Sequence, residues 1–109
     1  DALISFHSKG FPLDKAQAYA ALRRPYLIND LMTQPVVQDR RQVYAVLRKH
    51  NIPTPPHAIV NRDENGVEDC SFEETDEYLL IDGWRVSKPF VEKPVSGDDH
   101  NIIVYYPHS

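Results

Sequence analysis

Nine prolines are spread along a chain of 109 residues, and they limit the length of every helix and strand that it can form. Proline has no backbone N–H. Within a helix it is therefore tolerated only in the first turn, and within a sheet it is confined to edges and bulges. We expect the prolines to mark element boundaries. In particular, Pro25 and Pro53 are expected to end two helices.

The first 34 residues have the pattern of an α/β unit. An apolar run predicts a short buried strand at residues 2–6, and a second strand is predicted at residues 26–28. Between them, Pro12 can stand in the first turn of a helix that runs to about Arg23. Strand, helix and strand in this order indicate the end of a small α/β domain.

Residues 35–109 are predicted to form one helix followed by antiparallel strands. Thr33 is the predicted N-cap and Pro35 fits the first turn, so we expect this helix to continue to about Lys49. Asp82-Gly83 lies between two apolar runs and is a strong signal for a two-residue hairpin. The fold class is therefore α/β (α+β). Strands are expected at residues 57–60, 78–81, 84–86, 90–95 and 101–106, and an acidic, mobile surface loop at residues 61–77.

Charge and cysteine content narrow the function classes. The net charge of −4 makes the chain a poor bulk binder of nucleic acid. Residues 1–60 carry +4 and residues 61–109 carry −8. The basic half could hold a compact polyanion, or the two halves could simply form solvated faces of opposite sign. Cys70 is the only cysteine and forms no internal disulfide, which favours a reducing compartment.

No segment has the pattern of a membrane span or a leader peptide. The longest purely apolar run, residues 102–106, is far shorter than the roughly 20 residues that a span needs. The chain begins without Met and inside an apolar run, so we expect it to be an excerpt from a longer protein. Cytoplasmic residence is the resulting prediction.

Arg40 interrupts the apolar side of the second predicted helix. At about 100° per residue, it falls in the middle of the arc that Val36, Val43, Tyr44 and Leu47 form. A guanidinium there must reach solvent or meet an anion, because an unpaired buried charge is costly. It could bind a phosphate, form a structural ion pair with a carboxylate elsewhere, or extend out to water.

Two further residues break the pattern of their surroundings. In the strand predicted at residues 90–95, Lys93 shares a face with Val91 and Val95, which indicates either an edge strand or a charged ligand over the sheet. His100 follows the next turn and could donate to a phosphate oxygen or stand in solvent. From the residues alone, Arg40, Lys93 and His100 are the candidates for an anion site.

Motifs for other chemistries are absent from the sequence. It contains no P-loop, no GxGxxG and no GxSxG. The histidines have no metal-binding spacing, so no metal ligands are predicted in the chain. Cys70 lies in an acidic loop that disfavours the thiolate, and we discount it as a nucleophile. No catalytic residue is therefore predicted in this chain.

Seven blocks of sequence resemble one family of kinases. The longest are residues 3–16 (LISFHSKGFPLDKA) and 88–96 (KPFVEKPVS), and the others are residues 28–31, 38–44, 61–63, 99–101 and 105–107. Together, and with matching spacing, they resemble the kinase domain of the diphosphoinositol pentakisphosphate kinases, the Vip family. The stretch from residue 64 to residue 85 is the least similar.

The resemblance implies an ATP-dependent enzyme. Residues 1–34 would be the C-terminal part of an α/β domain, and residues 35–109 the first subdomain of an ATP-grasp fold. The family would use ATP and Mg²⁺ to phosphorylate inositol hexakisphosphate and 5-diphosphoinositol pentakisphosphate at the 1-position phosphate. The implied partners are inositol polyphosphate, ATP, the rest of the kinase domain and a phosphatase-like domain.

The same resemblance implies roles for four residues. Arg40, Lys93 and His100 match the positions that contact ATP, and Lys9 would add to the positive field over the inositol phosphate. The glycine-rich phosphate loop and the magnesium-binding acids would lie outside this chain, so the isolated chain is expected to be inactive. Two alternatives stay open: a non-catalytic module that binds inositol polyphosphate or nucleotide, and a purely structural fragment.

Overall fold

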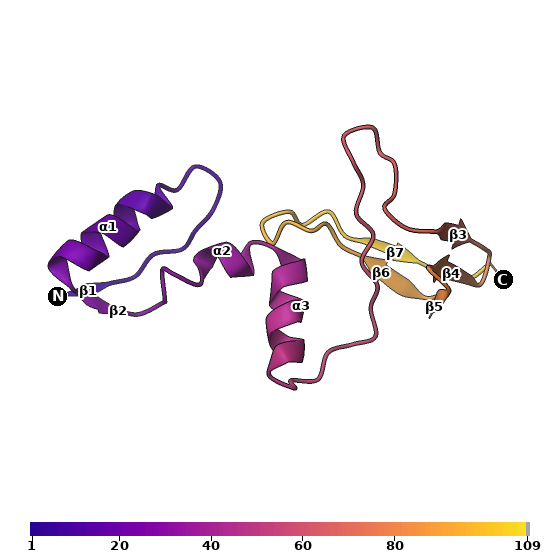
Figure 1. Cartoon of the computed structure of the whole chain (residues 1–109), viewed down its shortest axis with the longest axis horizontal. Coiled ribbons are helices and arrows are strands. Elements are labelled where there is room, and N and C mark those ends of the chain that lie inside the picture. Colours follow the sequence, from indigo (N-terminus) through magenta and orange to yellow (C-terminus); the bar gives the residue numbers. More distant parts are fainter. Residues whose placement is uncertain (109) are drawn as a thin grey trace.

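The structure is an elongated row of small elements. The computed structural model describes residues 1–108, and Figure 1 shows its helices and strands following one another along the long axis. The chain measures 58 × 34 × 24 Å and has a radius of gyration of 18.3 Å, where a compact domain of this length would have roughly 13 Å. Helices occur together with separate, mostly antiparallel small sheets, which confirms the α+β class.

The N-terminal unit has the predicted order of strand, helix and strand. β1 (Ala2–Leu3) and β2 (Tyr26–Leu27) pair in parallel, and α1 (Leu13–Arg23) connects them. Both strands are shorter than predicted. The side-chain amide of Asn29 continues their pairing, because it accepts from the N–H of Ser5 and donates to the carbonyl of the same residue.

Local signals account for both ends of α1. Pro12 stands directly before its first residue, and Asp14 lies in the first turn, where the helix dipole favours negative charge. At the other end, Arg24 turns into the left-handed region with a φ of 51° and donates its N–H to the carbonyl of Ala20. Pro25 follows and prevents a further turn.

The single helix predicted from Thr33 to Lys49 is wrong, because two helices occupy its place. α2 (Gln34–Val37) is only one turn long, and α3 (Arg40–Lys49) begins after a break at Asp39. Asp39 has an extended backbone (φ −116°, ψ 109°), and its carboxylate caps α3 by accepting a backbone N–H of the first turn. The N–H of Arg40 donates to the carbonyl of Val95, which is distant in sequence. This bond takes the place of the one that a continuous helix would form.

The break changes the helical pattern on which the prediction for Arg40 was based. Val36 belongs to α2 and therefore no longer contributes to the same apolar side. Within α3, Arg40 is the first residue, and Val43, Tyr44 and Leu47 follow it on one side of the helix and are half-buried. Arg40 therefore stands at the head of this apolar side rather than in its middle.

The Asp82-Gly83 hairpin is confirmed. It joins β4 (Tyr78–Ile81) to β5 (Trp84–Ser87), and its two residues have positive φ values of 48° and 79°, which fit a two-residue turn of the I′ type. β3 (Phe72–Glu74) completes an antiparallel sheet in the order β3-β4-β5. Part of the segment predicted as an acidic loop is therefore a strand.

A second antiparallel ribbon consists of β6 (Phe90–Glu92) and β7 (Ile103–Tyr105). Both strands are shorter than predicted. Lys93 follows the end of β6, so the predicted alternation with Val91 and Val95 does not apply. Pro94 explains the early end, because it lacks the N–H that a sheet ladder needs.

The strand predicted at residues 57–60 is wrong, because this segment forms none. Pro55 and Pro56 precede it and cannot donate to a ladder. The ring of His57 instead stacks on Tyr44 of α3 with 4.2 Å between the centroids, and its Nδ1 lies 2.9 Å from the carbonyl oxygen of Pro55. The segment is thus held against a helix.

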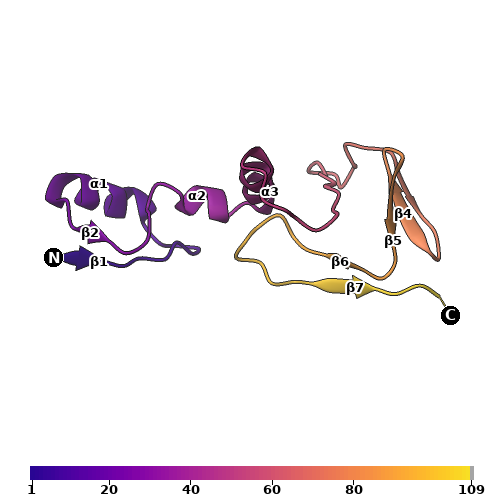
Figure 2. The same ribbon diagram turned by 90° about the horizontal axis from the view of Figure 1, so that it is seen from below.

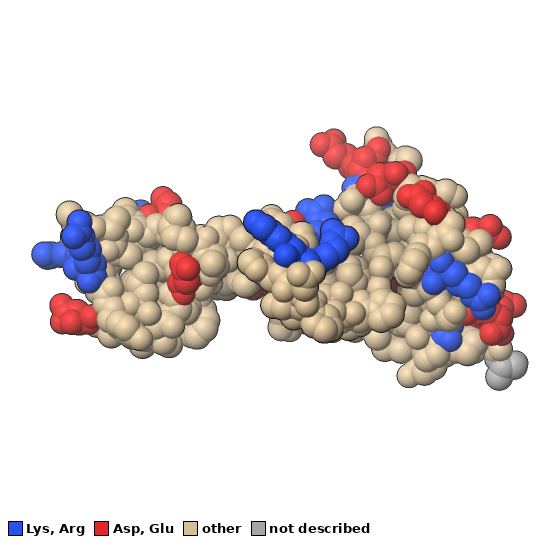
Figure 3. All heavy atoms as spheres, turned by 60° about the horizontal axis from the view of Figure 1, so that its bottom comes forward, with Lys and Arg blue, Asp and Glu red and all other residues tan. Residues whose placement is uncertain are grey.

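The hydrophobic core is very small. Among residues 1–108, only Leu31 and Ile81 are buried hydrophobic residues, and most of the large apolar side chains of β6 and β7 are exposed. The accessible surface is 8588 Å², where a compact protein of this mass would have roughly 6200 Å². Figure 3 shows the corresponding shape, in which a narrow waist separates two bulkier ends. None of the helices in the described part of the chain is long and apolar enough to cross a membrane.

The isolated chain is therefore expected to lack a sharp thermal transition. With so little buried apolar surface, the free energy of unfolding should be low and the unfolding poorly cooperative. Circular dichroism should show a broad loss of helix on heating, and the exposed apolar surface should bind the dye ANS at room temperature. A single steep transition without dye binding would contradict this expectation.

Candidate functional site

The loop between β6 and β7 folds back onto the break between α2 and α3. Figure 2 shows this loop reaching from the ribbon toward the two helices. The N–H of Gly97 donates to the carbonyl of Gln38 at 2.7 Å, and Asp39 and Ser96 form an isolated antiparallel bridge. A Cβ on Gly97 would lie 2.6 Å from the carbonyl oxygen of Val37, so the two backbones are in close contact. This junction is the structural basis of the site.

Arg40 strengthens the junction with its side chain. Its Nε donates to the carbonyl of Pro94 at 2.9 Å, and its Nη2 donates to the carbonyl of Asp99 at 3.3 Å. These two carbonyls belong to the residue after Lys93 and the residue before His100. The half-buried guanidinium thus draws the loop toward the start of α3. None of the ion pairs within residues 1–108 includes Arg40, so the predicted structural carboxylate partner is not found there.

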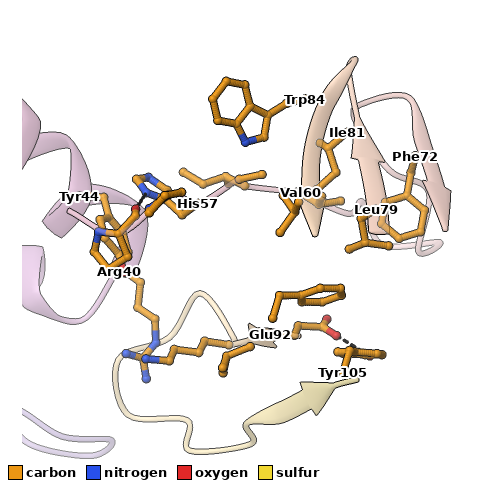
Figure 4. A pocket seen from close by; sticks show the side chains of 18 of the residues that line it. Arg40, Tyr44, His57, Val60, Phe72, Leu79, Ile81, Trp84, Glu92 and Tyr105 are labelled. Atoms are coloured by element: carbon orange, nitrogen blue, oxygen red, sulfur yellow. Dashed lines mark hydrogen bonds between the residues drawn. The ribbon is translucent and has the colours of Figure 1, made fainter. Parts of the chain in front are cut away.

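Arg40 and Lys93 line the same pocket, which has a volume of about 1020 Å³. In Figure 4, Arg40 and Tyr44 approach it from α3, Trp84 and Ile81 from the β4–β5 hairpin, and Glu92 from the ribbon. Lys93 is exposed, as is His100. His100 lines neither this pocket nor the second one, although its preceding residue is bound to Arg40.

Lys9 lies in a second, smaller cleft beside the same loop. Ser8, Lys9, Ser96, Asp98 and Asp99 line this cleft, which has a volume of about 650 Å³. The backbone N–H of Lys9 donates to the carboxylate of Asp98 at 3.2 Å, and this bond ties the N-terminal unit to the loop. With two aspartates beside one lysine, the cleft carries less positive charge than the pocket of Arg40.

The larger pocket is also lined by three arginines that the sequence analysis did not single out. They are Arg41, Arg62 and Arg85. Together with Arg40 and Lys93 they outnumber the two carboxylates of the lining, Glu74 and Glu92. Both carboxylates are engaged, because Glu74 pairs with Lys88 and Glu92 accepts from the hydroxyl of Tyr105. The lining therefore carries more positive than negative side chains, and two of its arginines, Arg41 and Arg62, are themselves paired with Asp39 and Glu68. A signal for Arg41 did exist, since it directly follows Arg40.

Asp39 and Arg41 form the most perturbed ionisable pair of the site. Arg41 contacts both carboxylate oxygens, with Nε at 3.0 Å and Nη2 at 2.7 Å, and its backbone N–H also donates to Asp39. These side-chain hydrogen bonds lower the pKa of Asp39 from 3.8 to about 2. The same bonds raise the pKa of Arg41. Asp39 is therefore fully ionised at any pH at which the protein would work.

The surroundings of Cys70 disfavour its thiolate form. Partial burial, followed by the charges of Asp82, Asp69 and Glu68, raises the pKa of the Cys70 thiol, which agrees with discounting it as a nucleophile. Among residues 1–108, no three His, Cys, Asp or Glu side chains are grouped in a way that could hold a metal ion.

Comparison with known proteins identifies what the chain is similar to. A family model described as the diphosphoinositol pentakisphosphate kinase 2 N-terminal domain matches residues 1–39. The chain is 55% identical over 109 residues to "Inositol hexakisphosphate and diphosphoinositol-pentakisphosphate kinase 2" of Homo sapiens, which covers 100% of this chain and 9% of that protein.

Relatives from distant organisms agree with this match. The identity is 52% over 109 residues to "Inositol hexakisphosphate and diphosphoinositol-pentakisphosphate kinase VIP1" of Arabidopsis thaliana, covering 100% of this chain and 10% of that protein. It is 47% over 126 residues to the "Inositol hexakisphosphate and diphosphoinositol-pentakisphosphate kinase" of Saccharomyces cerevisiae, covering 97% of this chain and 11% of that protein. The chain thus spans about a tenth of the length of these relatives.

The Asp39–Arg41 pair yields a direct prediction about pH. Because the folded pKa lies below the unfolded value, the pair stabilises the start of α3 fully above about pH 4. This stabilisation is lost as the pH falls toward about 2. Carbon-13 NMR of the Asp39 carboxyl group should show a midpoint near 2 in the wild type and one closer to 3.8 in Arg41→Ala. Equal midpoints in the two proteins would show that the pair does not form.

Proposed function

We propose that this chain, which belongs to the Vip family of inositol hexakisphosphate and diphosphoinositol-pentakisphosphate kinases, is part of an ATP-dependent inositol polyphosphate kinase. The substrates proposed are inositol hexakisphosphate and 5-diphosphoinositol pentakisphosphate, and the acceptor is the phosphate at the 1-position of the ring. Arg40, Lys93 and His100 would contact the phosphates of ATP, and Lys9 would face the inositol polyphosphate.

One observation carries the proposal. Arg40 and Lys93 are far apart in sequence, but they line one pocket whose arginines outnumber its carboxylates. Arg40 brings them together by binding the carbonyl of Pro94, which directly follows Lys93. Its guanidinium has further N–H groups that these backbone contacts do not use, and a planar fork of this kind suits a phosphate.

Phosphoryl transfer suits a site of this type. The reaction needs little covalent chemistry from the protein, because positioning and charge neutralisation supply most of the catalysis. Mg²⁺, when bound with ATP, would neutralise charge on the nucleotide phosphates. The described residues offer no grouped metal ligands, so we propose that those ligands lie outside this chain and assign no step to the metal. The residues in hand would bind and orient phosphates.

Several finer features belong to the same proposal. We propose that residues 1–34 end an α/β domain and that residues 35–109 begin an ATP-grasp fold. The partners would be the rest of the kinase domain and a phosphatase-like domain in the full-length protein, in the cytoplasm. The parallel β1–β2 unit and the separate antiparallel sheets support this division.

A second candidate is a non-catalytic module that binds inositol polyphosphate or nucleotide. The lack of grouped acids within residues 1–108 favours it over an enzyme that is complete in this chain. The two candidates share the cationic pocket and differ only in turnover. Kinase activity of the full-length protein therefore separates them.

Calorimetry on the isolated chain tests the pocket itself. Inositol hexakisphosphate and Mg-ATP should bind weakly, and added salt should reduce the affinity because the cations are partly exposed. Arg40→Ala/Lys93→Ala should lower the affinity about tenfold or more. The matched control is Lys15→Ala/Lys49→Ala, which removes the same charge from exposed positions that line neither pocket. Equal losses in the two double variants would show that net charge alone, and no site, causes the binding.

Activity of the full-length protein tests the enzyme assignment. Lys93→Ala should lower kinase activity toward inositol hexakisphosphate by at least about a hundredfold, because a lysine on the transferring phosphates stabilises developing charge. Lys15→Ala on α1 should leave the activity unchanged, and the isolated 109-residue chain should show no turnover. If Lys93→Ala is as active as the wild type, Lys93 has no role at the nucleotide.

A further inference from the structure

Arg41 lines the pocket, but most of its contacts are made to the protein. Its Nε and Nη2 hold the two carboxylate oxygens of Asp39, and its Nη1 donates to the side-chain oxygen of Asn61 at 2.8 Å. Each of its guanidinium nitrogens therefore has a protein acceptor. Arg40, by comparison, donates to two backbone carbonyls and leaves its Nη1 without an acceptor among the described residues.

Asp39 occupies the point where the elements of the site meet. It caps α3, its backbone bridges Ser96 in the β6–β7 loop, and Arg40 is the next residue. The charge of Asp39 therefore belongs to the residue directly before Arg40, which lines the pocket, and electrostatic interactions act over roughly 10 Å at moderate salt. If this carboxylate were not neutralised, it would repel an anion in the pocket and compete with that anion for Arg40.

We propose that Arg41 is a positioning residue that shields the pocket from the charge of Asp39. It neutralises the carboxylate and holds it in a fixed bidentate contact, so that the free N–H groups of Arg40 stay directed to a phosphate. This inference rests on the proposed function, since shielding matters only if the pocket binds phosphate. Arg41 would thus influence ligand binding without touching the ligand, because it neutralises Asp39.

Arg41 also contacts the first residue of the acidic segment, Asn61. Asn61, which accepts from Arg41, donates its backbone N–H and its side-chain amide to Asp69 at 3.1 and 2.8 Å. These bonds lower the pKa of Asp69 and fix its carboxylate on Asn61. One guanidinium thus anchors the start of the segment that carries most of the negative charge of the chain.

Steady-state kinetics of the full-length protein can separate shielding from a structural role. Arg41→Ala should raise the KM for ATP about tenfold and change kcat by less than about twofold, because one uncompensated charge weakens phosphate binding. Adding Asp39→Asn to that variant should bring the KM back to within about threefold of the wild type. Asparagine is as good an N-cap as aspartate, so the start of α3 is preserved in the double variant.

Arg62→Ala is the matched control. Arg62 lines the same pocket, is exposed to a similar extent (45% against 43% for the side chain of Arg41) and pairs with Glu68 in place of Asp39. It should raise the KM less than Arg41→Ala does. The inference is overturned if Asp39→Asn fails to rescue Arg41→Ala, because Arg41 would then contact the ligand directly or only support the fold.

The same assay distinguishes this inference from the proposed function. If Lys93→Ala is impaired and the rescue is absent, the kinase assignment stands and shielding by Arg41 is wrong. If Lys93→Ala and Arg40→Ala both keep wild-type activity and KM, the proposed function fails and the inference fails with it. Melting temperatures of all variants complete the test, since loss of fold alone would lower them equally in Arg41→Ala and in the double variant.

Discussion

The hydrogen bonds from the guanidinium of Arg40 to the carbonyls of Pro94 and Asp99 hold the site together. Hydrogen bonds from a charged donor contribute about 1.5–3 kcal/mol each when they are protected from water, and less for a half-buried group such as this one. They determine where the β6–β7 loop lies, and through it the positions of Lys93 and His100. The break between α2 and α3 lies in the same region, because the N–H of Arg40 donates to the carbonyl of Val95 in this loop. The residue that we propose as a phosphate ligand is therefore, in the structure, the residue that positions the loop.

The charge around the pocket differs from the net charge of the chain. The chain carries −4 overall, and Figure 3 shows acidic side chains gathered over the end that holds the sheets. At the pocket, Glu74 is paired with Lys88 and the neighbouring Asp39 with Arg41, and Glu92 keeps its charge but accepts a hydrogen bond from Tyr105. A polyanion would therefore meet cations whose neighbouring carboxylates are already neutralised or hydrogen-bonded.

The features predicted correctly from the sequence are those with local causes. The hairpin at Asp82-Gly83 and the helix between Pro12 and Pro25 depend on turn and capping chemistry within a few residues. The break at Asp39 has one local cause, the N-cap that its carboxylate forms, and this signal was missed. Its other causes are backbone bonds to residues 95–97, which no local pattern reveals. β6 was predicted too long because Pro94 ends it early, and within residues 1–108 both β6 and β7 pair only with each other.

The candidate site shows the same division between local and distant causes. Helical spacing marked Arg40 as unusual, although Val36, one of the four apolar residues used in that argument, belongs to another helix. Nothing in the spacing of Lys93 predicted that it would share a pocket with Arg40, since the contact depends on a loop folding back. The residues alone made both of them candidates for an anion site, and the family resemblance assigned both to the nucleotide. Arg41 was not singled out from the sequence, because its role depends on where Asp39 and Asn61 lie.

The geometry of the site and its rigidity have different physical sources. Short-range hydrogen bonds among Arg40, Asp39 and the β6–β7 loop set the positions of the cations, and these bonds lie wholly within the chain. Rigidity would require a packed core beneath them, and here the ribbon of β6 and β7 exposes most of its apolar side chains. Any ordering that the chain undergoes when an anion binds would cost free energy and reduce the affinity. Covering the ribbon in a larger assembly would remove this cost without changing any contact to the ligand.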